Sequence, residues 1–88
     1  MQLLARNQVK DYDHWRKVFD AQSEASHDSG LKVLQMWRAA DDPNDVFFLF
    51  SVEDRARAEA YMSTPEAAAV GEESGVLGGE YHFLNPVP

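Results

Sequence analysis

The stretch Val46-Phe47-Phe48-Leu49-Phe50 decides the fold of this chain. Its five apolar residues do not alternate with polar ones, which is typical of a β-strand that is covered on both faces. The turn-forming sequence Asp41-Asp42-Pro43-Asn44-Asp45 precedes it and predicts a hairpin with the strand before it. A chain of 88 residues has few elements with which to cover both faces of a strand. We therefore expect a second copy of the chain to supply part of the cover.

The rest of the chain alternates between strand and helix patterns. We expect strands over residues 2–9, 31–40, 46–52 and 80–84, and helices over residues 11–28, 53–62 and from 65 to about 71. Asp11 and Thr64 are the expected N-caps, and Gly30 is the expected end of the first helix. This β-α-β-β-α-β order predicts a single domain over residues 1–88, with the ferredoxin-like α+β fold. Right-handed crossovers then place the helices on one face of a four-stranded antiparallel sheet.

The second face of that sheet is also apolar. Alternation puts Phe48 and Phe50 on one side of the third strand and Phe47 and Leu49 on the other. A large apolar patch is rare on the surface of a soluble monomer. We therefore predict a homodimer in which two sheets pack face to face.

Composition excludes several classes of protein. Fifteen acidic residues against eight basic ones give a net charge of −7, and no basic stripe is present, so nucleic acid is not an expected partner. There is no cysteine, which excludes disulfides and thiolate metal sites. No segment approaches the roughly 20 apolar residues of a membrane span, and the first residues are too weakly apolar for a signal peptide. We expect a cytoplasmic protein without a metal site, an organic cofactor or a membrane partner.

Three segments stand out as motifs: Asp11 to Asp20, Asp41 to Val46, and Ser63-Thr64-Pro65-Glu66. They resemble the corresponding segments of small members of the dimeric α+β barrel superfamily, and the likeness is greatest to antibiotic biosynthesis monooxygenase-like and cyclase-like proteins. The resemblance implies a homodimer with a ligand cavity between helices and sheet in each subunit. The superfamily includes cofactor-free quinone-forming monooxygenases, heme-degrading monooxygenases, polyketide cyclases and a lactone isomerase.

The same resemblance implies a catalytic role for Asn7, because quinone-forming and heme-degrading relatives carry an asparagine in this part of the first strand. There its amide can hold an oxygenated intermediate. The structural alternative is a strand-end asparagine that bonds to neighbouring backbone groups. Heme is not expected, because the segment from Pro65 to Gly75 lacks the histidine that heme-degrading relatives use as axial ligand.

His82 is the best-placed candidate for a catalytic base. Neutral imidazole suits the removal of a proton from an acidic phenol or a 1,3-dicarbonyl compound near pH 7. Glu80 and His82 share one face of the last strand, and the structural alternative is a solvated pair on that face.

Aromatic residues predict a cavity for a small hydrophobic or aromatic molecule. The candidate ligand-binding residues are Trp37, Tyr61, Tyr81 and Arg38. Alternation along 31–40 groups Trp37 with Leu31 and Val33, and we predict a cavity lined in part by Asn7, Trp37, Tyr61 and His82. A shift of one residue in register would exchange Trp37 and His82 for Arg38 and Tyr81.

Three functions remain open from the sequence. The first is a cofactor-free enzyme of monooxygenase, cyclase or isomerase type that acts on a phenolic or polyketide-like substrate. The second is a ligand-binding or accessory dimer without turnover. The third is a structural dimer whose cavity is filled.

Overall fold

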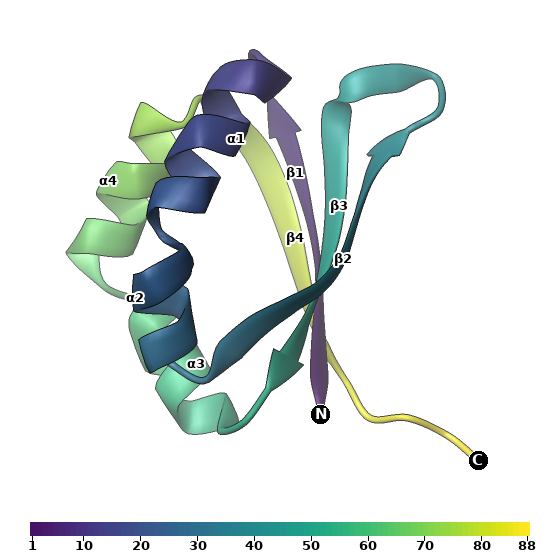
Figure 1. Cartoon of the computed structure of the whole chain (residues 1–88), viewed down its shortest axis with the longest axis vertical. Helices are drawn as coiled ribbons and strands as arrows, with labels where there is room; N and C mark the ends of the chain where they lie inside the picture. The colour runs from purple at the N-terminus through teal and green to yellow at the C-terminus, as the bar shows by residue number, and fades with distance from the viewer.

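The computed structural model describes residues 1–88 and has four strands and four helices. In chain order they are β1 (Gln2–Val9), α1 (Tyr12–Ala21), α2 (Ser23–Asp28), β2 (Leu31–Ala39), β3 (Asp42–Val52), α3 (Arg55–Met62), α4 (Pro65–Glu73) and β4 (Val76–Leu84). The strands form one antiparallel sheet in the order β2-β3-β1-β4. All four helices cover one face of this sheet (Figure 1). The ferredoxin-like α+β fold is therefore confirmed. None of the four helices has the length and apolar character of a membrane span.

The helices begin where short polar side chains cap them. Asp11 accepts a hydrogen bond from the backbone N–H of His14 at 3.2 Å, and Thr64 accepts one from the N–H of Ala67 at 3.1 Å, as the sequence predicted. α3 starts two residues later than expected, because Asp54 is its cap and accepts from Ala56 N–H at 2.9 Å.

The helix expected over residues 11–28 is divided in two. Gln22, with φ −94° and ψ 1°, separates α1 from α2. Trp15 of α1 is buried, whereas α2 has the sequence Ser-Glu-Ala-Ser-His-Asp and buries no residue. Helices gain most of their stability from packing an apolar face. The apolar face that packs on the sheet belongs to α1 and does not continue into α2. Gly30, with φ 78°, then turns the chain into β2.

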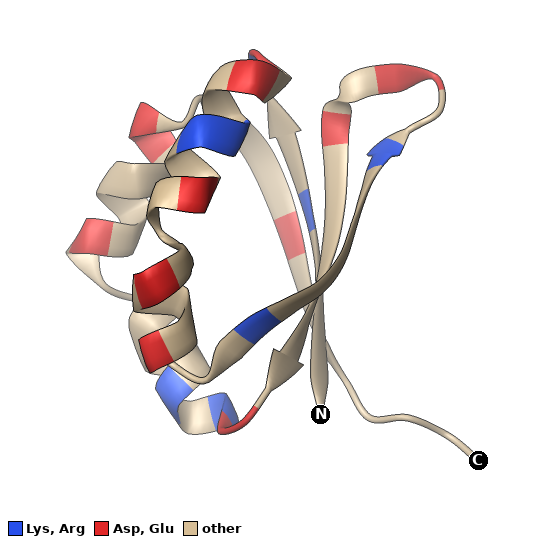
Figure 2. Ribbon diagram, in the orientation of Figure 1, with Lys and Arg blue, Asp and Glu red and all other residues tan.

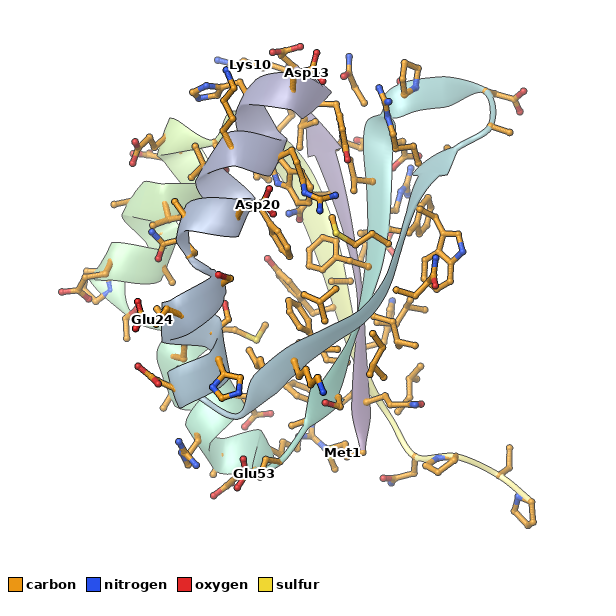
Figure 3. All side chains as sticks on the ribbon, viewed as in Figure 1. Met1, Lys10, Asp13, Asp20, Glu24 and Glu53 are labelled. Carbon is orange, nitrogen blue, oxygen red and sulfur yellow. The ribbon has the colours of Figure 1, made fainter.

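The core lies between the helices and the sheet, and side chains from both project into this layer (Figure 3). Ten buried apolar residues make it up: Leu3, Ala5, Val9, Trp15, Leu31, Val46, Phe48, Phe50, Val52 and Ala58. Aromatic rings connect its two layers, because Phe19 of α1 lies 4.8 Å from Trp15 and 5.4 Å from Phe48, centroid to centroid. Such pairs stabilise the core beyond the area that they bury.

A bulge in β2 reverses the faces that simple alternation predicts. Val33 pairs with Phe50 of β3, but the next paired residue is Gln35, so Leu34 is an extra residue in the strand. Beyond the bulge, Met36 pairs with Phe48 on the helix side, and Trp37 pairs with Phe47 on the other side. The grouping of Trp37 with Leu31 and Val33 on one face was therefore wrong.

β4 is longer than expected, because Gly78 and Gly79 are strand residues and not a loop. Gly79 pairs with Asn7 of β1. A Cβ atom at Gly79 would lie 2.8 Å from Asn7 Oδ1 and 3.1 Å from the carbonyl oxygen of Arg6. The close approach of these two strands therefore requires glycine at this position.

The face of the sheet away from the helices is uncovered (Figure 1). Leu4, Phe47 and Leu49 are half-buried there, and the exposed fraction of Trp37 is 46%. Arg6 lies among them and pairs with Asp45 at 2.8 Å and with Glu80 at 3.3 Å. Acidic residues are spread along the helices on the opposite face (Figure 2). The open face is thus the more apolar of the two outer surfaces.

Candidate ligand cavity

A cavity of about 470 Å³ lies between the helical layer and the sheet. Leu3 and Asn7 of β1 and Phe48 of β3 form part of its floor, while α1 contributes Trp15 and α3 contributes Tyr61. Every one of these side chains belongs to a regular element, so the shape of the cavity is set by the packing of the fold. Its volume is within the usual range for small-molecule sites.

The lining of the cavity carries no charge. Fourteen of its 20 residues are hydrophobic, and none of the other six is aspartate, glutamate, lysine, arginine or histidine. An ionised group placed there would lose its hydration without gaining a partner of opposite charge, which is costly. The cavity therefore favours an uncharged ligand.

Asn7 is the most deeply buried polar side chain of the lining that lacks a partner. Its exposed fraction is 7%, and its Oδ1 atom has no hydrogen-bond partner. Leaving a buried polar atom unpaired costs about 1–3 kcal/mol, so native structures rarely do so without a reason. This oxygen exposes less than 1 Å² in the ligand-free protein, so a ligand in the cavity can supply the missing hydrogen bond only once the amide turns toward it.

Two tyrosines also line the cavity. Tyr81 of β4 pairs with Ala5, on the same face of the sheet as Asn7, and Tyr61 reaches the cavity from α3. Tyr81 is half-exposed at the edge of the cavity, and desolvation raises the pKa of its phenol above the ordinary value. Its hydroxyl group therefore stays protonated at neutral pH and is available as a hydrogen-bond donor.

Several solved structures share this arrangement over nearly the whole chain. A candidate antibiotic biosynthesis monooxygenase from Bordetella bronchiseptica has a TM-score of 0.77 and 10% identity, over 99% of this chain and 96% of that one. A second one, from Bacteroides thetaiotaomicron, has a TM-score of 0.73 and 21% identity, over 100% and 90%. A further antibiotic biosynthesis monooxygenase has a TM-score of 0.71 and 17% identity, over 99% and 98%. The chain has the fold of these solved structures. No protein-family model matches the sequence, and comparison with the curated proteins gives no match.

Within this fold, three of the six residues proposed from sequence reach the cavity. They are Asn7, Tyr61 and Tyr81. His82 does not reach the cavity, because it pairs with Leu4 and points to the open face. There its Nε2 atom lies 3.4 Å from Oε2 of Glu80. Its predicted position in the cavity was wrong, and the cavity has no imidazole base.

Trp37 and Arg38 are also outside the cavity. The bulge at Leu34 turns Trp37 to the open face. Arg38 is turned to the helix side, but its guanidinium carbon lies 3.9 Å from the centre of the Tyr12 ring, and its Nε donates to the carbonyl of Pro43 at 3.0 Å. Arg38 therefore holds the β2–β3 turn against α1 and does not line the cavity.

Phe19 and Gly79 are two residues that shape the site and that sequence reasoning missed. Phe19 belongs to the apolar stripe of α1, and its spacing gives no sign that it also borders open space. Gly79 shapes the site by letting β4 approach Asn7, and the Gly78-Gly79 pair was the available signal. No group of three or more histidine, cysteine, aspartate or glutamate residues is arranged to hold a metal ion.

Proposed function

We propose that this protein binds an uncharged, flat aromatic molecule of phenolic or polyketide-like type in the cavity between its helices and its sheet. The observation that carries this proposal is the buried amide of Asn7, which belongs to the lining of a cavity without charged groups and whose Oδ1 atom has no hydrogen-bond partner. A phenolic hydroxyl group is a hydrogen-bond donor of the kind that this oxygen can accept. The apolar remainder of the ligand would displace water from the apolar lining.

The aromatic lining supports a flat ligand in particular. The rings of Trp15, Phe48 and Phe50 face the cavity. Phe48 and Phe50 are perpendicular to each other, with centroids 5.5 Å apart, so they offer both a face and an edge to a third ring. Stacked and edge-to-face contacts are the arrangements that aromatic rings prefer.

Turnover is a second candidate function, and the pair Asn7 and Tyr81 favours it. Both side chains lie on one face of neighbouring strands, and the Tyr81 hydroxyl can donate a hydrogen bond to an oxyanion. In a cofactor-free monooxygenase reaction, a phenol would reduce dioxygen, so that one oxygen atom enters the ring to give a quinone and the other leaves as water. Cyclase- and isomerase-type reactions need the same stabilisation of an enolate.

The absence of a base in the lining restricts which substrates can react. No histidine, aspartate or glutamate lines the cavity. The proton of the substrate must therefore leave to solvent at the edge of the cavity, which only an acidic phenol or a 1,3-dicarbonyl compound allows at neutral pH. We rank binding before turnover for this reason.

We also propose that two copies pack through their open sheet faces. Leu4, Phe47, Leu49 and Trp37 expose apolar surface there, and nothing in the monomer covers it. The resemblance to dimeric α+β barrel proteins supports the same assembly. Burying this surface would remove the cost of exposing it to water.

Intrinsic fluorescence tests ligand binding directly, because the chain has only two tryptophans. In a Trp37→Phe variant, Trp15 in the cavity lining is the sole reporter. We expect 1-naphthol to quench it in a saturable way at one site per chain, and the charged analogue 1-naphthoate to fail. The proposal is refuted if 1-naphthol and 9-anthrone give no saturable quenching, or if 1-naphthoate binds equally well.

Catalysis has a separate test. With 9-anthrone as substrate, oxygen uptake and quinone formation should be equal in amount. Asn7→Ala should lower the rate more than the affinity if the amide acts mainly in the transition state. Saturable binding of anthrone without any oxygen uptake would leave the protein as a binding module.

A further inference from the structure

We infer that Phe19 sets the length of the ligand by closing the cavity against a second apolar compartment beside it. This inference rests on the proposed function, because it concerns the ligand of the same cavity. The second compartment, the outer groove, has a volume of about 390 Å³ and lies between α2 and the edge strand β2. Phe19, Leu31, Val33 and Phe50 make its apolar surface, and Glu24, His27 and Lys32 lie among its polar residues.

The cavity and the outer groove are neighbours with a common boundary. Four residues line both of them: Phe19, Ser26, Leu31 and Phe50. Asn7, Trp15 and Phe48 line only the cavity, whereas Lys32 and Val33 line only the outer groove. A ligand anchored at Asn7 would therefore have to pass this boundary to use the apolar surface of the groove.

Of the four boundary residues, Phe19 is the one that closes the space between helix and sheet. Leu31 and Phe50 belong to the sheet, with exposed fractions of 4% and 6%, and Ser26 is too small to span the distance. The Phe19 ring comes from α1 and lies 6.2 Å from the ring of Phe50 and 5.4 Å from that of Phe48. The side chain is partly buried and borders both compartments, so we expect that shortening it joins them.

The outer groove is itself suited to bind an apolar part of a ligand. α2 covers it without burying any of its own residues, so the apolar atoms of Val33 and Phe19 have no apolar partner on that side. An alkyl chain or an additional ring would bury this surface. With Phe19 in place, the protein should instead select compact aromatic ligands over the same ring with a long tail.

A series of 4-alkylphenols, from propyl to decyl, measures the length that the cavity accepts. Binding is followed by Trp15 fluorescence in the Trp37→Phe background. Each buried methylene should raise affinity about fourfold. In the protein with Phe19 we expect this gain to stop at a short chain, and in Phe19→Ala we expect it to continue for several further methylenes.

Two further variants separate the role of Phe19 from general loosening of the core. Val18 lines the cavity but not the outer groove. Val18→Ala should therefore change the affinity for all the alkylphenols alike, and the chain length at which the affinity stops rising (the plateau) should stay unchanged. Phe19→Leu keeps an apolar side chain and serves if Phe19→Ala does not fold. It should move the plateau by fewer methylenes.

The outcomes distinguish this inference from the proposed function. A gain that continues without a plateau when Phe19 is present, or a plateau at the same length in the Phe19 variants, overturns the role of Phe19 while short phenols still bind. Failure of every alkylphenol to bind, in all of these proteins, refutes the binding function and the inference together.

Discussion

The contact between Gly79 and Asn7 gives the sharpest prediction about the site. A Cβ atom at Gly79 would lie 2.8 Å from Asn7 Oδ1, a distance at which something must move. The adjacent Gly78 is a matched control, because the nearest atom to its added Cβ would be Gln8 Oε1, at 3.9 Å. Both positions belong to β4, so the two substitutions differ mainly in this contact.

The expected magnitudes follow from two opposing effects. Overpacking typically costs about 1–3 kcal/mol, whereas alanine in place of glycine in a strand gains about 0.5–1 kcal/mol. Gly79→Ala should therefore lower the free energy of unfolding by up to about 2.5 kcal/mol, whereas Gly78→Ala should raise it by about 0.5–1 kcal/mol, so that the two variants differ by about 1–3 kcal/mol. In a domain of this size, each kcal/mol corresponds to about 4–8 °C in Tm.

Urea and thermal unfolding of the two single variants measure this difference. A double-mutant cycle with Asn7→Ala then assigns its cause, because removing the Asn7 side chain should recover at least 0.5 kcal/mol of the loss, as is usual for residues in contact (about 0.5–3 kcal/mol). The Gly79→Ala variant should also bind 1-naphthol more weakly, since the amide is displaced. Equal stability of the two alanine variants, or no recovery in the cycle, would refute the close contact as the reason for glycine.

Three other predictions concern the assembly, heme and pH. Leu49→Asp would bury an unpaired charge between the sheets of the proposed dimer, at a cost of several kcal/mol. Sedimentation should therefore show a dimer for the natural protein and for Leu49→Val, but a monomer or insoluble material for Leu49→Asp. A natural protein that sediments as a 9.9 kDa monomer contradicts the dimer. Titration with ferric heme should give no histidine-dependent Soret shift, and a tight complex that is lost in His14→Ala or His82→Ala would overturn this. The hydrogen bonds from Arg6 lower the pKa of Asp45. The contribution of this ion pair to stability is therefore present above about pH 4 and is lost as the pH falls through the lower pKa of the folded state. The free energy of unfolding in urea, measured against pH, should depend less on acid in Asp45→Asn, and an unchanged dependence would contradict this assignment.

The fold was predictable because several local signals agreed with one another. The caps Asp11 and Thr64 and the unbroken apolar run from Val46 to Phe50 each have the role that the sequence indicated. The turn expected over Asp41 to Asp45 is shorter than predicted, because β3 already begins at Asp42. The division between α1 and α2 could also have been read from the sequence, because residues 23–28 have no apolar stripe.

The site was harder to predict, because its residues depend on strand register. The extra residue Leu34 in β2 reverses the faces of everything after it, and nothing in the sequence around it marks a bulge. In β4 the signal was present, since Tyr81 and Phe83 are more apolar than Glu80 and His82 and face the core as expected from hydrophobic burial. The catalytic role of Asn7 stays a prediction, as do the ligand-binding roles of Tyr61 and Tyr81.

Replacement of Asn7 by leucine, which has a similar shape, tests most directly whether the cavity is built for a ligand. If the amide is kept for binding, Asn7→Leu removes an unpaired buried polar group and should raise the free energy of unfolding of the ligand-free protein, by up to about 1–3 kcal/mol. The same variant should bind 1-naphthol at least about tenfold more weakly, which corresponds to 1.4 kcal/mol of lost interaction. Lower stability with unchanged affinity would show instead that Asn7 is a structural residue of β1, and would contradict the account of the cavity as a binding site.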